Sequence, residues 1–98
     1  MATNHYTLTV TNTPIRIAQG VGGDALVYVY LSNGAGEDCF IGDSSVSATG
    51  VNKGFAVHKY VSGSATSVAT FVLSSNDELY AVTDAAKTTD LTILITNA

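Results

Sequence analysis

Charge is scarce in this chain of 98 residues. It contains 4 Lys+Arg and 8 Asp+Glu, so charged residues make up only 12% and the formal net charge is -4. The cations Arg16, Lys53, Lys59 and Lys87 are well separated along the sequence. Nucleic-acid-binding proteins instead gather Lys and Arg into a patch that neutralises phosphates. We therefore expect no nucleic acid among the partners.

The sequence also has little that would direct it to a membrane. The first six residues, Met1 to Tyr6, show neither the charged start nor the apolar stretch of a signal peptide. The longest uninterrupted apolar run is Ala25 to Leu31, whereas a transmembrane helix needs about 20 apolar residues. We expect neither a signal peptide nor a membrane span.

Residues that bind metals are few. The chain has 1 Cys and 2 His, and a single cysteine cannot form an internal disulfide. No cations in the sequence around Cys39 would stabilise a thiolate, so we predict a small buried hydrophobic side chain. His5 and His58 show none of the spacings typical of metal ligands. We expect no metal and no cofactor.

Catalytic patterns are equally weak. Ser44 and Ser45 are not part of a Gly-x-Ser-x-Gly elbow that would present a nucleophile. Asp77 and Glu78 are adjacent at the entry to a strand, where successive side chains point apart and cannot share a proton. The glycines of Gly20–Gly23 precede a strand pattern and not the helix that would hold a phosphate. We expect no enzymatic activity.

Strong helix formers are rare, which indicates the fold class. There are two Glu, three Lys, one Arg, one Gln and one Met, against thirteen Thr and eleven Val. β-Branched residues are stiff at χ1 and pack well on a pleated sheet. Residues AVILMFWYC make up 46% of the chain, enough for one modest core. We predict a single domain over residues 1–98, with 1–5 as a flexible arm.

Alternation and turn residues divide the chain into about eight short strands. The connections are too short for crossover helices, so the sheets must be mostly antiparallel. We predict an all-β protein, a single antiparallel β-sandwich or small barrel. The predicted strands are 6–10, 15–17, 25–31, 38–42, 55–60, 68–73, 79–82 and 91–96.

Several connections and strand positions can also be predicted. Pro14 confines the strand at 15–17 to a strand end or a sheet edge. The short turn 33–36 favours a hairpin between its flanking strands, whereas the long segment 43–54 is typical of a crossover between sheets. The strand 68–73 can tolerate burial on both faces. The alternating threonines of 7–13 indicate the solvent-facing side of an edge strand.

Tyr28 and Tyr30 are the candidate partner interface. They alternate with Val27, Val29 and Leu31, so one face of this strand carries the tyrosines, whose large amphipathic rings are common at interfaces. Two alternatives stay open: both faces lie in the core, or the hydroxyls simply reach water. Uncharged strand edges invite aggregation of a free monomer, so we expect an assembled state.

The order of segments resembles that of small virion proteins of tailed phages. The likeness spans about residues 7–96, and its most specific pieces are Phe40-Ile41-Gly42 and Asp77-Glu78-Leu79-Tyr80-Ala81-Val82. The chain departs from the pattern at 62–67, where the family often has a Gly-Glu turn. These pieces belong to the four segments that carry the likeness, which are 27–33, 38–50, 73–82 and 91–95.

The resemblance implies a β-sandwich subunit of a phage particle. The function it suggests first is a capsid decoration protein, made in the host cytoplasm, that binds the major capsid protein lattice on the outer surface of the head. It also suggests a homo-oligomer, with a trimer as our guess. Similar sandwiches occur in head fibres, necks and tails. A carbohydrate- or cell-surface-binding module is a further alternative, in which Tyr60 or Tyr80 would stack on a sugar ring.

Overall fold

The computed structural model describes residues 2–20, 23–31, 38–57, 68–84 and 87–97, and these form strands and their connections without a helix. The prediction of an all-β fold is confirmed. The strands are β1 (Ala2–Val10), β2 (Ile15–Gln19), β3 (Ala25–Leu31), β4 (Cys39–Gly42), β5 (Phe55–Val57), β6 (Val68–Leu73), β7 (Glu78–Thr83) and β8 (Thr89–Asn97).

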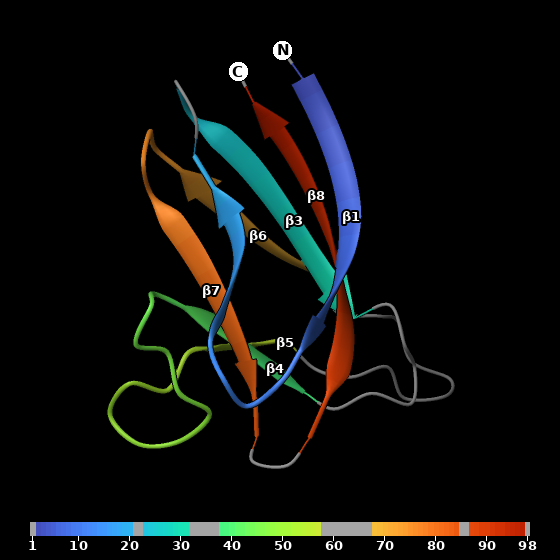
Figure 1. The fold of residues 1–98 in the computed structure, drawn as a ribbon. Coiled ribbons are helices and arrows are strands. Elements are labelled where there is room, and N and C mark those ends of the chain that lie inside the picture. Colours follow the sequence, from blue (N-terminus) through green and yellow to red (C-terminus); the bar gives the residue numbers. More distant parts are fainter. Residues whose placement is uncertain (1, 21–22, 32–37, 58–67, 85–86, 98) are drawn as a thin grey trace.

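The strands form two four-stranded sheets that pack as a sandwich (Figure 1). The first sheet has the order β1-β8-β3-β6 and the second sheet has the order β2-β7-β4-β5. Every pairing between these strands is antiparallel, as predicted. Ala2 pairs with Asn97, so the two ends of the chain lie side by side in the first sheet.

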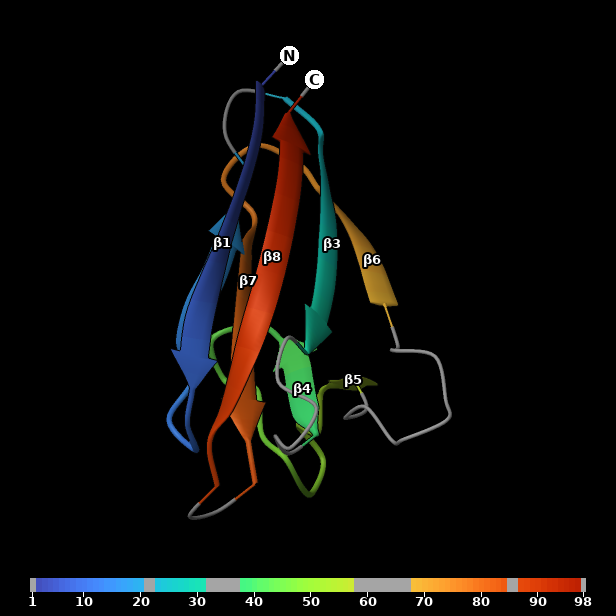
Figure 2. The same ribbon diagram turned by 90° about the vertical axis from the view of Figure 1, so that its right-hand side faces the viewer.

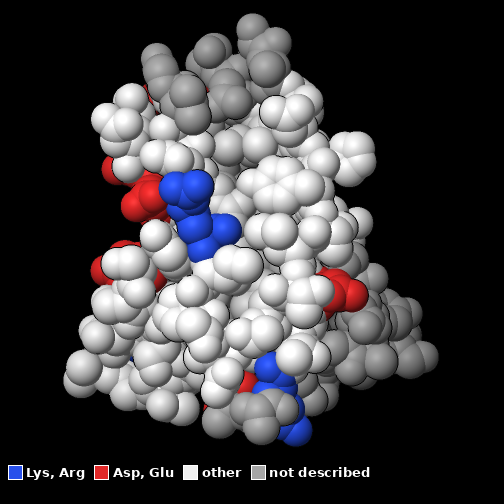
Figure 3. Space-filling view, viewed as in Figure 1, with Lys and Arg blue, Asp and Glu red and all other residues white. Residues whose placement is uncertain are grey.

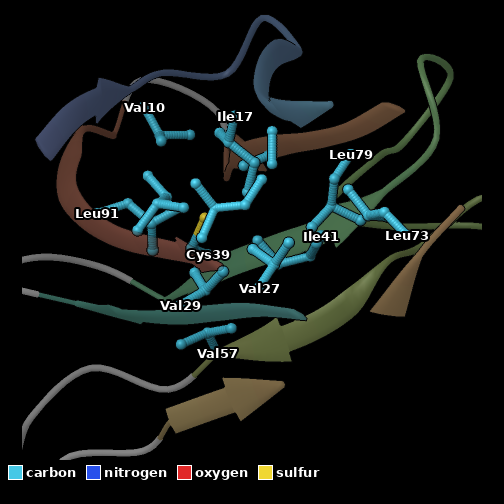
Figure 4. Packing of buried hydrophobic residues seen from close by; sticks show 14 of the residues in the cluster. Val10, Ile17, Val27, Val29, Cys39, Ile41, Val57, Leu73, Leu79 and Leu91 are labelled. Atoms are coloured by element: carbon cyan, nitrogen blue, oxygen red, sulfur yellow. The ribbon is translucent and has the colours of Figure 1, made fainter. Parts of the chain in front are cut away.

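The core lies between the two sheets (Figure 4). In β3 and β8 every second residue is buried, which is the period-2 pattern of a strand with one core face. The second sheet contributes Ile17, Cys39, Ile41, Leu79 and Ala81 to the same cluster. Cys39 is a free, fully buried thiol, and burial raises its pKa to about 12. Its prediction as a buried hydrophobic side chain is confirmed.

Two predicted connections are wrong. β3 belongs to the first sheet and β4 to the second, so these strands do not form a hairpin. The apolar faces of β3 and β4 are instead buried against each other across the core. The predicted turn at 33–36 lies outside the described residues. Conversely, β4 pairs with β5 within the second sheet, so residues 43–54 do not cross between sheets. This loop folds back on itself instead, with the amide of Val46 donating to the Asp43 carbonyl at 3.0 Å.

Two strand predictions also need correction, and a third extends beyond the described residues. β6 is an edge strand that pairs only with β3 among the described strands, so its outer side chains are exposed and not buried. Residues 2–5 are not a separate arm, because they pair with β8 and extend β1. β5 covers Phe55–Val57, and the rest of the predicted strand 55–60 lies outside the described residues.

The β2 edge of the second sheet is irregular. β2 is an edge strand, as Pro14 predicts, and its register with β7 shifts between Arg16 and Ala18. At the other edge, β5 is described over Phe55–Val57, and the chain that follows it lies outside the described residues. Pro, charges and bulges all hinder the pairing of an edge with another chain.

Candidate interaction surface

Tyr28 and Tyr30 lie on the outer face of the first sheet, the face turned away from the second sheet. Their exposed fractions are 37% and 39%, whereas Val27, Val29 and Leu31 are buried. The strand that carries them, β3, lies inside the sheet between β8 and β6. The alternative that both faces of β3 lie in the core is therefore wrong, and both tyrosines are available to a partner or to water.

The register of the four strands places other side chains beside the two tyrosines. On one face of an antiparallel sheet, directly opposed residues have Cβ atoms about 4.5–5.5 Å apart. The rows that contain the outer residues of β3 are Thr3, Thr96, Leu26 and Val72; then His5, Leu94, Tyr28 and Thr70; then Thr7, Thr92, Tyr30 and Val68.

These rows divide the outer face into two halves. The half over β3 and β6 is apolar, and it reaches Leu94 on β8. We call the exposed apolar side chains of this half, which surround the exposed Thr70, the apolar patch: Leu26, Tyr28, Tyr30, Val68, Val72 and Leu94. Sequence reasoning found only its tyrosines. The alternation of Val68, Thr70 and Val72 could have indicated an exposed face, but the equally apolar residues between them hid the pattern.

The half over β1 and β8 is polar but nearly uncharged. The hydroxyls of Thr3 and Thr96 lie 3.3 Å apart, and Thr9 donates to Asp90 Oδ1 at 2.9 Å. Thr7 on β1 pairs in the same way with Thr92 at 3.2 Å. β1 is an edge strand with its threonines outward, as predicted. The threonine row ends with the strand at Val10, because Thr11 and Thr13 lie beyond it.

Charge is sparse on the face of the molecule that Figure 3 shows. Figure 3 shows Lys and Arg atoms in small separate groups on a mostly uncharged surface. On the outer face of the first sheet, Asp90 is the one acidic residue among the described positions of the four strands, and these strands carry no Lys or Arg. A partner on this face would be recognised by shape and apolar contact, with little contribution from charge.

The serines considered as nucleophiles belong to a local turn. The backbone amide and hydroxyl of Ser45 both donate to Asp43 Oδ1, at 2.9 and 2.7 Å. These two hydrogen bonds, the hydroxyl's above all, hold the pKa of Asp43 below its ordinary value. Asp43, Ser44 and Ser45 are all exposed. The carboxylate therefore has a structural role here, because it closes the turn that follows β4.

Asp77 and Glu78 have different partners, as predicted from their positions at the start of a strand. Asp77 Oδ2 accepts a hydrogen bond from the amide of Ser74 at 2.9 Å. Glu78 forms an exposed ion pair with Arg16, with 3.0 Å between Nη1 and Oε2. The Asp77 carboxylate thus stabilises a turn, and the Glu78 carboxylate links β7 to β2. The two do not form an acid–base pair.

The remaining candidates are dispersed. His5 lies at the edge of the first sheet, and His58 lies outside the described residues. Within the described ranges, no three His, Cys, Asp or Glu side chains come together as a metal-binding group. Tyr80 is half-buried on β7 in the second sheet, and Tyr60 lies outside the described residues. The structure does not place Tyr80 beside Tyr28 and Tyr30.

The hollows of the surface are small. One lies beside Ile41, Val46 and Phe55 and has a volume of about 200 Å³, and another beside Tyr6 and Arg16 measures about 260 Å³. Pockets for small molecules usually measure roughly 300–1,000 Å³. None of the described segments forms a helix that could cross a membrane. The apolar patch is therefore the feature of the described residues that best fits an interaction.

Comparisons with known proteins assign no family to the chain. No family model matches it, and no curated protein matches it. One similar solved structure is that of Bacillus endospore appendages, described as forming a family of disulfide-linked pili. The TM-score is 0.48 and the identity 19%, with 99% of this chain and 87% of that chain covered. The function must therefore be inferred from the residues and the surface of the chain itself.

Proposed function

We propose that this protein is a non-enzymatic structural subunit of a virus particle that attaches to an assembled capsid lattice through the outer face of its first sheet. The observation that carries the proposal is the apolar patch around Tyr28 and Tyr30, on a face whose strands carry no Lys or Arg. Covering such a patch removes apolar surface from water, which favours association. The resemblance to tailed-phage virion proteins supports a capsid as the partner.

Attachment to a lattice would stabilise the particle by linkage. A protein that binds the assembled shell but not the free capsid subunit shifts the equilibrium towards the shell. Tyrosine suits this role because it supplies a large contact area, while its hydroxyl keeps the unbound face compatible with water. The two tyrosines are held by a strand that is paired on both sides, so their positions are fixed before binding.

The test is to mix the purified protein with expanded, undecorated capsids of the phage that carries its gene, to sediment the particles and to count bound copies. Saturation at a lattice-related number, on the order of hundreds of copies, supports decoration. The absence of binding, with the protein recovered in neck or tail fractions at a few copies, would contradict it and favour a fibre, neck or tail component.

A further inference from the structure

The two sheets differ in how their edges are protected. The β2 edge of the second sheet has features that hinder pairing with another chain: Pro14, Arg16 and a register shift. The first sheet has none of these. β1 and β6 contain no proline, glycine or Asp, Glu, Lys or Arg residue, and they are 9 and 6 residues long. An unprotected edge of this kind is a template for another strand.

The edges of the first sheet also differ from each other. On the side of β1, the Tyr6 hydroxyl donates to the Ile17 carbonyl of β2, which ties the two sheets together. Arg16 and Glu78 lie on β2 and β7, so charge is present in the neighbouring strands. The outward side chains of β1 are threonines and His5. This edge is therefore polar.

The side of β6 is apolar. Figure 2 shows β6 at one edge of the first sheet, with β5 on the same side of the sandwich. Val68, Val72 and Phe55 have exposed fractions of 58%, 63% and 75%. Phe55 packs edge-to-face on Phe71, with 6.2 Å between ring centroids. Aromatic and valine side chains thus flank, on both faces of the sheet, the edge of β6 that pairs with no other described strand.

We infer that β6 pairs with β6 of a second copy of this chain, in an antiparallel twofold dimer whose first sheets join into one sheet of eight strands. Among the described strands, β6 pairs only with β3, so its other edge can take another strand, whose backbone would replace water as the hydrogen-bond partner of its amides and carbonyls. A twofold axis makes the two β6 strands antiparallel, which continues the alternation of the sheet. The inference goes beyond attachment to a capsid and does not depend on it.

The sequence of β6 is self-complementary for this pairing. Paired residues must face the same side of a sheet, so an axis through Thr70 places Val68 opposite Val72 of the second copy and Ala69 opposite Phe71. Such β-branched and aromatic cross-strand pairs are stabilising. The chain has a net charge of -4, but β6 itself is uncharged, so its self-pairing sets no like charges opposite each other. Pairing of β6 with β1 would instead set valines against threonines.

The test is analytical ultracentrifugation of the free protein over a concentration series, without capsids. We expect a monomer–dimer equilibrium. Val68→Lys and Val72→Lys should each raise the dimer dissociation constant at least about tenfold, because each replaces both Val68–Val72 cross-strand pairs of the dimer with a lysine opposite a valine. Both positions are exposed, and an unchanged far-UV circular dichroism spectrum would verify that the variants are folded.

Two controls carry the same added charge. Val51→Lys lies in the loop 43–54 at a fully exposed position, and Thr7→Lys lies on β1, the opposite edge of the first sheet. Both should leave the dimer unchanged. A wild-type monomer throughout, a trimer or longer species, a dimer that tolerates lysine at 68 and 72, or a dimer lost with Thr7→Lys would each overturn the inference. Capsid binding is scored separately, so the two proposals can fail independently.

Discussion

Gly20 lies directly against the backbone of Ser74, at the point where the chain passes from β6 in the first sheet to β7 in the second. A Cβ atom at residue 20 would lie 2.0 Å from the Ser74 carbonyl oxygen. The amide of Gly20 donates to the Asp77 carbonyl at 2.8 Å, and the Gly20 carbonyl accepts from Asn76 at 3.0 Å. This contact fastens the end of β2 to the connection between the sheets.

Gly20→Ala should therefore destabilise the fold by about 3 kcal/mol, because backbone and not a flexible side chain must move to admit the methyl group. Gly23→Ala is the matched control, since no heavy atom lies within 4 Å of a Cβ built there. Its effect should stay within about 0.5 kcal/mol. Urea denaturation of both variants measures the difference, and equal stabilities would contradict the packing described here.

The thiol of Cys39 should be unreactive towards thiol reagents in the native protein. It is fully buried, and its pKa is raised from 9.0 to about 12 by burial. The thiolate is the reactive form, so labelling should require unfolding. The chain has 1 Cys, so any thiol labelling that is measured comes from Cys39. Reaction with a thiol reagent should be rapid in denaturant and at least about a hundredfold slower without it; fast native labelling would be inconsistent with this burial.

The raised pKa of Cys39 also makes the free energy of unfolding depend on pH in the alkaline range. The native protein holds the thiol proton more tightly than the unfolded chain does, so the contribution of this group is fully present below about pH 9 and lost as the pH rises towards about 12. The free energy of unfolding should fall by up to about 1.4 kcal/mol per pH unit in this window. Cys39→Ala should weaken this slope, although it lowers stability at neutral pH, where the thiol is protonated in both states. An unchanged slope would assign the effect to other groups, such as Tyr6, whose pKa burial also raises.

Two buried threonines should respond in opposite ways to valine. The Thr83 hydroxyl donates to the Lys87 carbonyl at 2.8 Å, so Thr83→Val should cost about 1 kcal/mol. The Thr89 hydroxyl is buried without a hydrogen-bond partner among the described residues. Thr89→Val removes an unsatisfied polar atom at nearly constant volume and should leave stability unchanged or raise it by about 1 kcal/mol. Thermal unfolding of the two variants compares them directly, and a large loss with Thr89→Val would contradict the assignment.

The sequence predicted the elements of the fold better than their pairing. Strand positions such as Ala25–Leu31 follow from alternation, because a strand with one core face must repeat every two residues. The partners of β3 and β4 do not follow, since two apolar strands joined by a short connection can lie side by side or face each other across the core. The order of strands in a sandwich depends on contacts between residues far apart in the chain.

The candidate surface was predicted in part for a related reason. Tyr28 and Tyr30 stand out because a large amphipathic ring alternates with buried valines. Val68 and Val72 do not stand out, because valine is equally suited to a core and to an edge. They are exposed because they lie on the outer face of the first sheet, at its β6 edge. Residue type thus identified the tyrosines, while topology was needed to find the rest of the patch.

The most direct test of the proposed function compares Tyr28→Ser/Tyr30→Ser with Val51→Ser in capsid co-sedimentation. Both tyrosines are on the outer face, so the double variant should remain folded, with an unchanged circular dichroism spectrum. Val51 is fully exposed on a loop, and its variant controls for the loss of an apolar side chain elsewhere. The account predicts that the double variant no longer sediments with capsids, while Val51→Ser binds like the wild type. Undiminished occupancy by the folded double variant would contradict it.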